Sequence, residues 1–207
     1  MKNKKKKDPF ETYCWYREAL NDPYQVFAAC FDFSAVFSLK KFIKEALLFA
    51  LKNKIYRKIE PANVLYRFQV IHSVMIAANC INKEHKTGPI DFAFGELLDK
   101  RLYCNNNEAL AEWECFPRLL TLDEYKNPYL VFKRFFKFQP LQKWREDMQE
   151  ILDYTLVSNT NDMDLNLLSR YFHLTKLFEA AHLIDVREVT HINGYYKKFS
   201  PGAVTND

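Results

Sequence analysis

One short stretch occurs twice in this chain, and it constrains the fold more than any other feature. The first copy is Asp22-Pro23-Tyr24-Gln25-Val26-Phe27, followed by Phe31 and Phe33. The second copy is Asn127-Pro128-Tyr129-Leu130-Val131-Phe132, followed by Phe136 and Phe138 in the same register. Asp or Asn before Pro is typical of a helix start, because the Asx side chain caps free amides and proline has no amide hydrogen to leave unpaired. We therefore expect each copy to begin a helix capped by Asp22 or Asn127.

The similarity between the two copies extends beyond their helix starts. On a helix, the Tyr, Val and Phe positions of each copy fall on two apolar stripes, which indicates a helix inside a bundle. Downstream, Leu39-Lys40-Lys41-Phe42 aligns with Leu141-Gln142-Lys143-Trp144 if three residues are deleted. Either the chain arose by internal duplication, or an aromatic-rich helical protein uses the same caps twice.

Hydrophobic spacing predicts helices over most of the remaining chain. The clearest begins with a cap at Ser38, after which apolar residues recur every three or four positions opposite lysines. A capping box is expected at Thr121. Asn193-Gly194 predicts either a short hairpin or a helix extension within residues 189–199. Further helices are expected over residues 8–20, 61–81, 90–104, 107–113, 140–157 and 163–188.

These patterns predict an all-α bundle of about seven or eight helices. It forms either one domain over residues 8–199 or two similar halves, 8–82 and 107–199. We expect residues 1–7 and 200–207 to be disordered tails. No apolar run approaches the about 18 residues that a membrane span requires, so we expect no span. The basic N-terminus is not followed by an apolar signal core, which favours a cytoplasmic protein.

The net charge of +4 comes from the N-terminal tail. Lys2 and the run from Lys4 to Lys7 supply five positive charges, which leaves 25 basic (30 − 5) and 26 acidic side chains in residues 8–207. The tail is either a solubilising, disordered end or a source of nonspecific attraction to RNA, DNA or an anionic membrane surface. Residues 38–58 are basic and residues 142–188 are acidic. These opposite fields predict docking with one another or with separate partners, unless both are solvated faces.

The stretch Arg67-Phe68-Gln69-Val70-Ile71-His72 has the form Arg-x4-His on a predicted helix. An imidazole serves as an acid or base, and a guanidinium binds phosphate oxygens. In this respect the chain resembles the HEPN superfamily, whose ribonuclease members pair two such motifs across a dimer. The resemblance implies that His72 acts on a ribose 2′-hydroxyl and that Arg67 holds the scissile phosphate. The chain departs from the family pattern at Phe68, where a polar residue is usual. If the two residues have only a structural role, we expect Arg67 to pair with a carboxylate and His72 to be half-buried.

Glu179-Ala180-Ala181-His182 places a carboxylate and an imidazole one helical turn apart. Di-iron bundles need two such pairs, and this chain has one. We therefore expect both side chains on a helix surface, and we expect neither a metal nor another cofactor. The five cysteines are odd in number and lack Cys-x-x-Cys spacing, so we expect reduced and mostly buried thiols.

The sequence contains no Walker, dinucleotide-binding, Gly-x-Ser-x-Gly or His-Glu-x-x-His pattern. We therefore expect a non-enzymatic helical module that binds another protein or a second copy of itself, or that has a structural role. The alternative is a HEPN-like, metal-independent ribonuclease of a toxin or defence system, acting through Arg67 and His72. A third hypothesis is a nucleic-acid-binding accessory protein that depends on the lysine tail.

Overall fold

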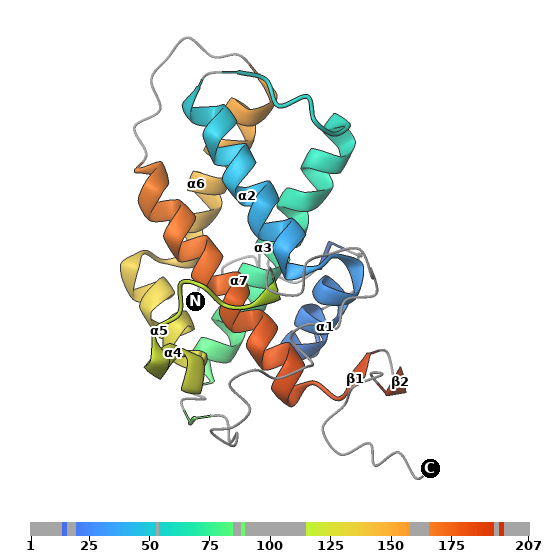
Figure 1. Cartoon of the computed structure of the whole chain (residues 1–207), viewed down its shortest axis with the longest axis vertical. Coiled ribbons are helices and arrows are strands. Elements are labelled where there is room, and N and C mark those ends of the chain that lie inside the picture. Colours follow the sequence, from blue (N-terminus) through green and yellow to red (C-terminus); the bar gives the residue numbers. More distant parts are fainter. Residues whose placement is uncertain are drawn as a thin grey trace, which may run out of the picture.

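The computed structural model describes residues 14–15, 20–52, 54–84, 88–89, 115–157, 166–192 and 195–196. In this part of the chain it contains seven α-helices and one short hairpin (Figure 1). The prediction of an all-α bundle is therefore confirmed. Both tails, most of residues 8–20 and the helices expected over 90–104 and 107–113 lie outside the described residues.

The two strands of the hairpin follow the last helix. The two strands pair antiparallel with Ile192 opposite Tyr195, so this segment is a hairpin and not a helix extension. In order, the elements are α1 (Pro23–Phe33), α2 (Val36–Leu51), α3 (Pro61–Lys83), α4 (Leu122–Lys126), α5 (Tyr129–Phe138), α6 (Leu141–Leu156), α7 (Leu167–Glu188), β1 (His191–Ile192) and β2 (Tyr195–Tyr196).

The two copies of the repeated stretch begin their helices differently. In the first, the Asp22 side chain accepts a hydrogen bond from the Tyr24 amide at 2.8 Å, as predicted. In the second, the backbone amide of Asn127 donates to the Asp123 carbonyl and ends α4. α5 then begins after Pro128 without a side-chain cap. The prediction of an Asn127 cap is wrong, because Asn127 already terminates the preceding helix.

Two other predicted caps can be compared with the structure. Thr121 and Glu124 form the expected capping box, with reciprocal bonds of 2.9 and 3.2 Å. The predicted cap at Ser38 is wrong, because α2 begins at Val36 and its N-cap is Ala35. The apolar side of α2 begins with Val36, which is buried, and this burial extends the helix by three residues toward its N-terminus.

Helices α1, α2 and α3 correspond to α5, α6 and α7 in length and in packing. Their lengths are 11, 16 and 23 residues in the first set and 10, 16 and 22 in the second. α1 and α5 each pack on both α3 and α7, while α2 packs on α6 and α7 and α6 packs on α2 and α3. Exchanging the two sets leaves this pattern unchanged. The two copies of the repeat thus occupy equivalent places, as internal duplication predicts.

Equivalent residues of the two copies contact each other inside the bundle. The hydroxyl oxygens of Tyr24 and Tyr129 lie 3.3 Å apart, across 105 positions of sequence. The ring centroids of Phe27 and Phe132, which are related by the same offset, lie 5.8 Å apart. Both phenylalanines are fully buried. One hydrophobic core therefore draws on both sets of helices.

The same offset continues through α2 and α6 without a gap. α2 begins at Val36 and α6 at Leu141, and each is 16 residues long. The alignment with a three-residue deletion is therefore wrong. Matching buried positions are Leu39 and Trp144, Ile43 and Met148, Ala46 and Ile151, Leu47 and Leu152, and Ala50 and Thr155.

α3 is buried on several sides and has a marked apolar character. Its length and composition meet the requirement for a membrane span, and 61% of its most apolar window is buried inside the bundle. Core helices of soluble proteins have the same character, so α3 gives only weak support for a span, and the absence of a span stays a prediction. The predicted buried seam is confirmed at Val64, Phe68, Ile71, Met75 and Ala78.

The described cysteines are reduced thiols, as predicted. Cys14, Cys30 and Cys115 are buried and Cys80 is half-buried, whereas Cys104 lies outside the described residues. Burial raises the pKa of the Cys30 thiol well above its usual value, which keeps it protonated.

We predict that Phe27→Ala and Phe132→Ala each lower the free energy of unfolding by about 3–5 kcal/mol, because each leaves a cavity in the shared core. The double variant should reveal a coupling of roughly 0.5–1.5 kcal/mol between the rings. Urea denaturation followed by circular dichroism measures both quantities. Phe33→Ala is the control, since Phe33 is exposed; equal losses for all three variants would contradict the central contact.

Candidate functional site

Arg67 and His72 both lie on α3 and are both half-buried. Five residues on an α-helix correspond to about 140° of rotation and about 7.5 Å of rise, so the side chains leave α3 on different sides. The Arg67 guanidinium lies over the Phe42 ring of α2, with Cζ 5.3 Å from the ring centroid. A shared catalytic site would therefore need groups from a second copy, and the ribonuclease interpretation stays a prediction.

The surroundings of Arg67 are a cluster of paired side chains. The Tyr56 hydroxyl donates to Glu45 at 2.9 Å, and Lys58 donates to the same carboxylate at 2.6 Å. Burial and the bond to Glu45 raise the pKa of Tyr56 to about 12, while the positive charge of Arg67 acts in the opposite direction. Burial alone would raise the pKa of Glu45, but the bonds from Lys58 and Tyr56 outweigh it and lower that pKa.

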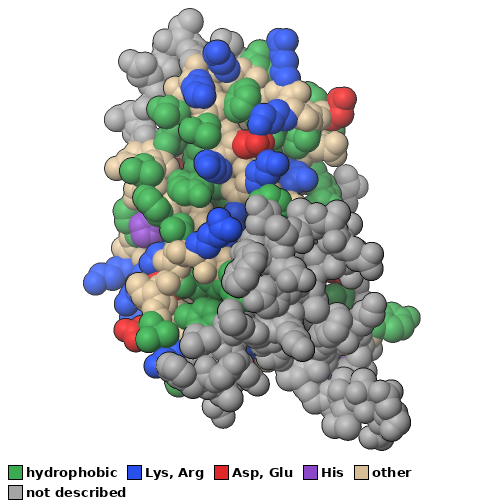
Figure 2. All heavy atoms as spheres, viewed as in Figure 1, with side chains coloured by type: hydrophobic (Ala, Val, Ile, Leu, Met, Phe, Trp, Pro, Cys, Tyr) green, Lys and Arg blue, Asp and Glu red, His purple; other side chains and the backbone are tan. Residues whose placement is uncertain are grey.

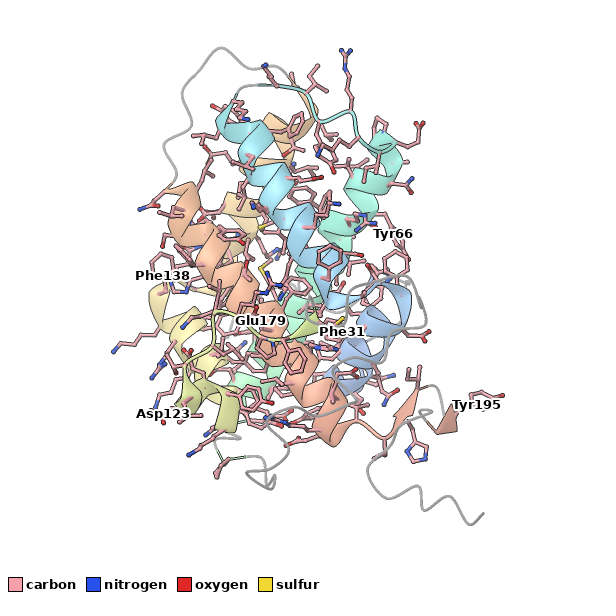
Figure 3. All side chains as sticks on the ribbon, in the orientation of Figure 1. Phe31, Tyr66, Asp123, Phe138, Glu179 and Tyr195 are labelled. Carbon is pink, nitrogen blue, oxygen red and sulfur yellow. The ribbon has the colours of Figure 1, made fainter. Side chains whose placement is uncertain are left out.

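Glu179 is a buried carboxylate near the centre of the molecule (Figure 3). One of its oxygens accepts hydrogen bonds from Lys40 Nζ and the Arg118 amide, both at 2.9 Å. The other oxygen accepts from the Leu119 amide at 2.9 Å. Lys40 also donates to the Phe116 carbonyl at 3.2 Å. The expectation that Glu179 lies on a helix surface is wrong, because the segment at 116–119 binds its carboxylate.

His182 lies one turn after Glu179 and is also buried, with 8% of its surface exposed. Its ring meets the edge of the Phe31 ring at a centroid distance of 4.9 Å. The expected surface position of His182 is therefore also wrong. No group of three or more His, Cys, Asp or Glu side chains that could hold a metal ion occurs among the residues described by the structure.

The two tyrosines of the repeat join a carboxylate at the end of α7. Tyr129 donates its hydroxyl hydrogen to Glu188, and the Tyr24 hydroxyl lies beside it. Burial, followed by the bond to Glu188, raises the pKa of Tyr129 far above its ordinary value. The Gln25 side chain donates to the His191 carbonyl at 3.0 Å and so ties the hairpin to α1. A protonated Tyr129 is therefore a fixed structural donor.

Asp147 is a buried carboxylate on α6 that binds side chains from its neighbours. Arg170 of α7 donates to it at 2.7 Å, and Gln139 donates at 2.9 Å. The Arg170 guanidinium also lies over the Phe138 ring at 5.2 Å, and the His173 ring stacks on the same ring at 4.1 Å. Burial and neighbouring cations lower the pKa of His173. This cluster connects α5, α6 and α7.

Glu124 connects α4 to two other helices. Besides its capping-box bond, it accepts from Lys176 of α7 at 2.7 Å and from Arg134 of α5 at 2.6 Å. Burial alone would raise its pKa, but these bonds and the backbone bond from Thr121 outweigh burial and lower the pKa. Glu124, Asp147 and Glu179 thus each bind two or more donors of their own chain, as structural carboxylates do.

No known protein family, curated protein or solved structure matches this chain. Its function must therefore be inferred from its own interior and surface. In the interior, the buried carboxylates described above hold helices and segments together. The surface carries the remaining candidates for binding.

Sequence reasoning missed the structural role of Glu179, although two signals pointed to it. Glu179 is flanked by apolar positions, Phe178 and Ala180, which is unusual for a surface turn. It also belongs to the acidic part of the chain, and Lys40 belongs to the basic part. The basic region 38–58 and the acidic region 142–188 therefore contact each other through one buried ion pair, Lys40 with Glu179.

We predict that Glu124→Gln reduces the pH dependence of stability on the acid side. A carboxyl whose pKa is lower in the folded state stabilises the fold above its unfolded pKa of about 4.3, and this contribution is lost as the pH falls through the folded pKa. Urea unfolding at neutral pH and at successively lower pH measures the effect. Glu146→Gln, at an exposed residue of α6, is the control; the same flattening in both variants would contradict the prediction.

We predict that Lys40→Met lowers the free energy of unfolding by about 3–5 kcal/mol, because it leaves the buried Glu179 carboxylate without its cation. Lys44→Met, at an exposed lysine one turn along the same helix, should change it by about 0.5 kcal/mol or less. Chemical denaturation of both variants provides the comparison. Equal effects would show that the ion pair is not important for stability.

Proposed function

We propose that this protein is a non-enzymatic helical module that binds another protein, or a second copy of itself, through an aromatic corner. The aromatic corner consists of Phe33 at the end of α1 and of Leu65 and Tyr66 on α3. Phe33 and Leu65 are 46% and 44% exposed. The Phe33 and Tyr66 rings meet edge to face with centroids 5.2 Å apart. Figure 3 shows Tyr66 on the outer side of α3.

The composition of this corner supports a protein partner. Cores of protein interfaces are enriched in aromatic side chains and depleted in charged ones. Two rings that already pack against each other lose little side-chain freedom when a partner covers them, so more of the contact energy contributes to affinity. The Phe33 ring lies at the end of α1 and the Tyr66 ring near the start of α3, and the hydrophobic core holds both helices in place.

The interior supports a binding role over a catalytic one. Its buried carboxylates are bound to lysine, arginine or backbone donors that connect helices. Such groups stabilise the fold and are poorly suited to transfer protons to a substrate. The described cysteines form no disulfide and are mostly buried, which suits a reducing compartment, so we propose a cytoplasmic location for this module.

We predict that Phe33→Ser combined with Leu65→Ser abolishes partner binding while the helical circular dichroism spectrum is kept. Light scattering detects self-association, and cross-linked capture from native lysate detects another partner. Leu122→Ser combined with Val157→Ser is the matched control, because both residues are exposed elsewhere.

Two results would contradict the proposal. The first is a strict monomer that captures nothing, and the second is equal binding by the corner variant and the control. RNA cleavage that His72→Ala abolishes would instead support the ribonuclease alternative.

A further inference from the structure

We propose that a second surface, the basic end of the bundle, docks on an anionic membrane surface without spanning the bilayer. The basic end is formed by the last turns of α2, the loop that follows, and the first turns of α7. Its residues are Lys44, Leu48, Leu51, Lys52, Lys54, Arg57, Lys58, Leu168 and Phe172. This inference goes beyond the proposed protein binding and uses a different surface.

The apolar side chains of the basic end lie at matching levels on two neighbouring helices. α2 and α7 run side by side in opposite directions (Figure 1). Lys40 of α2 contacts Glu179 of α7 at 2.9 Å, and this contact sets the register between the two antiparallel helices. A residue 11 positions after Lys40 therefore lies at about the same height as the residue 11 positions before Glu179. Leu51 is therefore about level with Leu168. These leucines are 67% and 66% exposed, and Leu48 and Phe172, about one turn further in, are also exposed.

Positive charges surround these apolar side chains. The stretch 41–60 carries six basic side chains and two carboxylates. One of the carboxylates, Glu45, accepts hydrogen bonds from Lys58 and Tyr56 and so has much of its charge offset. Figure 2 shows Lys and Arg side chains gathered among hydrophobic ones over the upper half of this face. The surface therefore combines an excess of cations with projecting apolar groups.

The loop that carries the basic residues is held against the bundle. The Tyr56 amide donates to the Thr155 carbonyl of α6 at 2.9 Å, and the Lys54 amide donates to the Phe49 carbonyl of α2 at 3.2 Å. The rings of Phe49 and Tyr56 also meet edge to face at 5.0 Å. The cations are thus presented from a fixed backbone, which lowers the ordering cost of binding to a surface.

The other repeat provides a contrast at equivalent positions. At the offset of 105 residues, Lys44 of the basic end corresponds to Gln149 and Leu48 to Asp153, both exposed on α6. At these two positions, one repeat presents a cation and an apolar side chain where the other presents a polar amide and a carboxylate. Peripheral membrane proteins insert apolar side chains at the headgroup boundary while Lys and Arg attract anionic lipids. The first face fits that chemistry, and the second does not.

The test measures sedimentation of the full chain with vesicles of phosphatidylcholine, with and without phosphatidylglycerol. We expect binding only to the anionic vesicles, and weaker binding at high salt. Lys52→Gln with Lys54→Gln should reduce the partition coefficient by about 25-fold, since each cation contributes roughly fivefold. Lys133→Gln with Lys137→Gln, at two exposed lysines of α5, removes the same charge and should have little effect.

Two further variants separate this surface from other causes of binding. Leu51→Ser with Leu168→Ser should weaken binding even at low salt, while Leu122→Ser should not. Replacing the tail lysines Lys4 to Lys7 with Gln should leave most of the binding intact.

Several results would overturn the inference. These are no binding to anionic vesicles, equal losses in the α5 control, or loss of binding in the tail variant. Binding to soluble polyglutamate as strong as to vesicles, with no effect of the leucine substitutions, would indicate an acidic protein partner instead. Circular dichroism verifies that each variant remains folded.

Discussion

The contact between the Phe27 ring of α1 and the Phe132 ring of α5 is the one on which the rest of the structure depends. Each of these helices packs on both α3 and α7, the two longest helices of the bundle. Burial of two aromatic rings there contributes to a core that both repeats share. Buried carboxylates connect other segments to this core. Glu179 binds the backbone of the segment at 116–119, and Glu124 connects α4 to α7.

We propose that the function of this protein lies on its surface. Charged groups inside the bundle are bound to one another, whereas outside it the two repeats differ in charge at equivalent positions. The aromatic corner is suited to a protein, and the basic end is suited to an anionic lipid surface. If both proposals hold, the chain would bring a protein partner to a membrane surface without any catalytic step.

The helices could be predicted from the sequence because hydrophobic spacing and Pro or Asx starts act over a few residues. The seam of α3 and the start of α1 follow from such local signals. The predictions that were wrong depend instead on contacts between segments far apart in the sequence. Asn127 does not cap α5 because α4 ends there, and Glu179 is buried because a segment about 60 residues away in sequence covers it. Local spacing puts Arg67 and His72 on different sides of α3, but it does not encode which helices cover each side.

The central claim is that the two repeats form one interlocked core, and cutting the chain tests it directly. Fragments 1–89 and 115–207 each carry one set of three long helices. The packing of α1 and α5 between helices of both sets predicts that neither fragment unfolds cooperatively alone. An equimolar mixture should regain the helical circular dichroism and cooperative urea transition of a complex. Cooperative unfolding of either fragment alone, unchanged by adding the other, would contradict the claim.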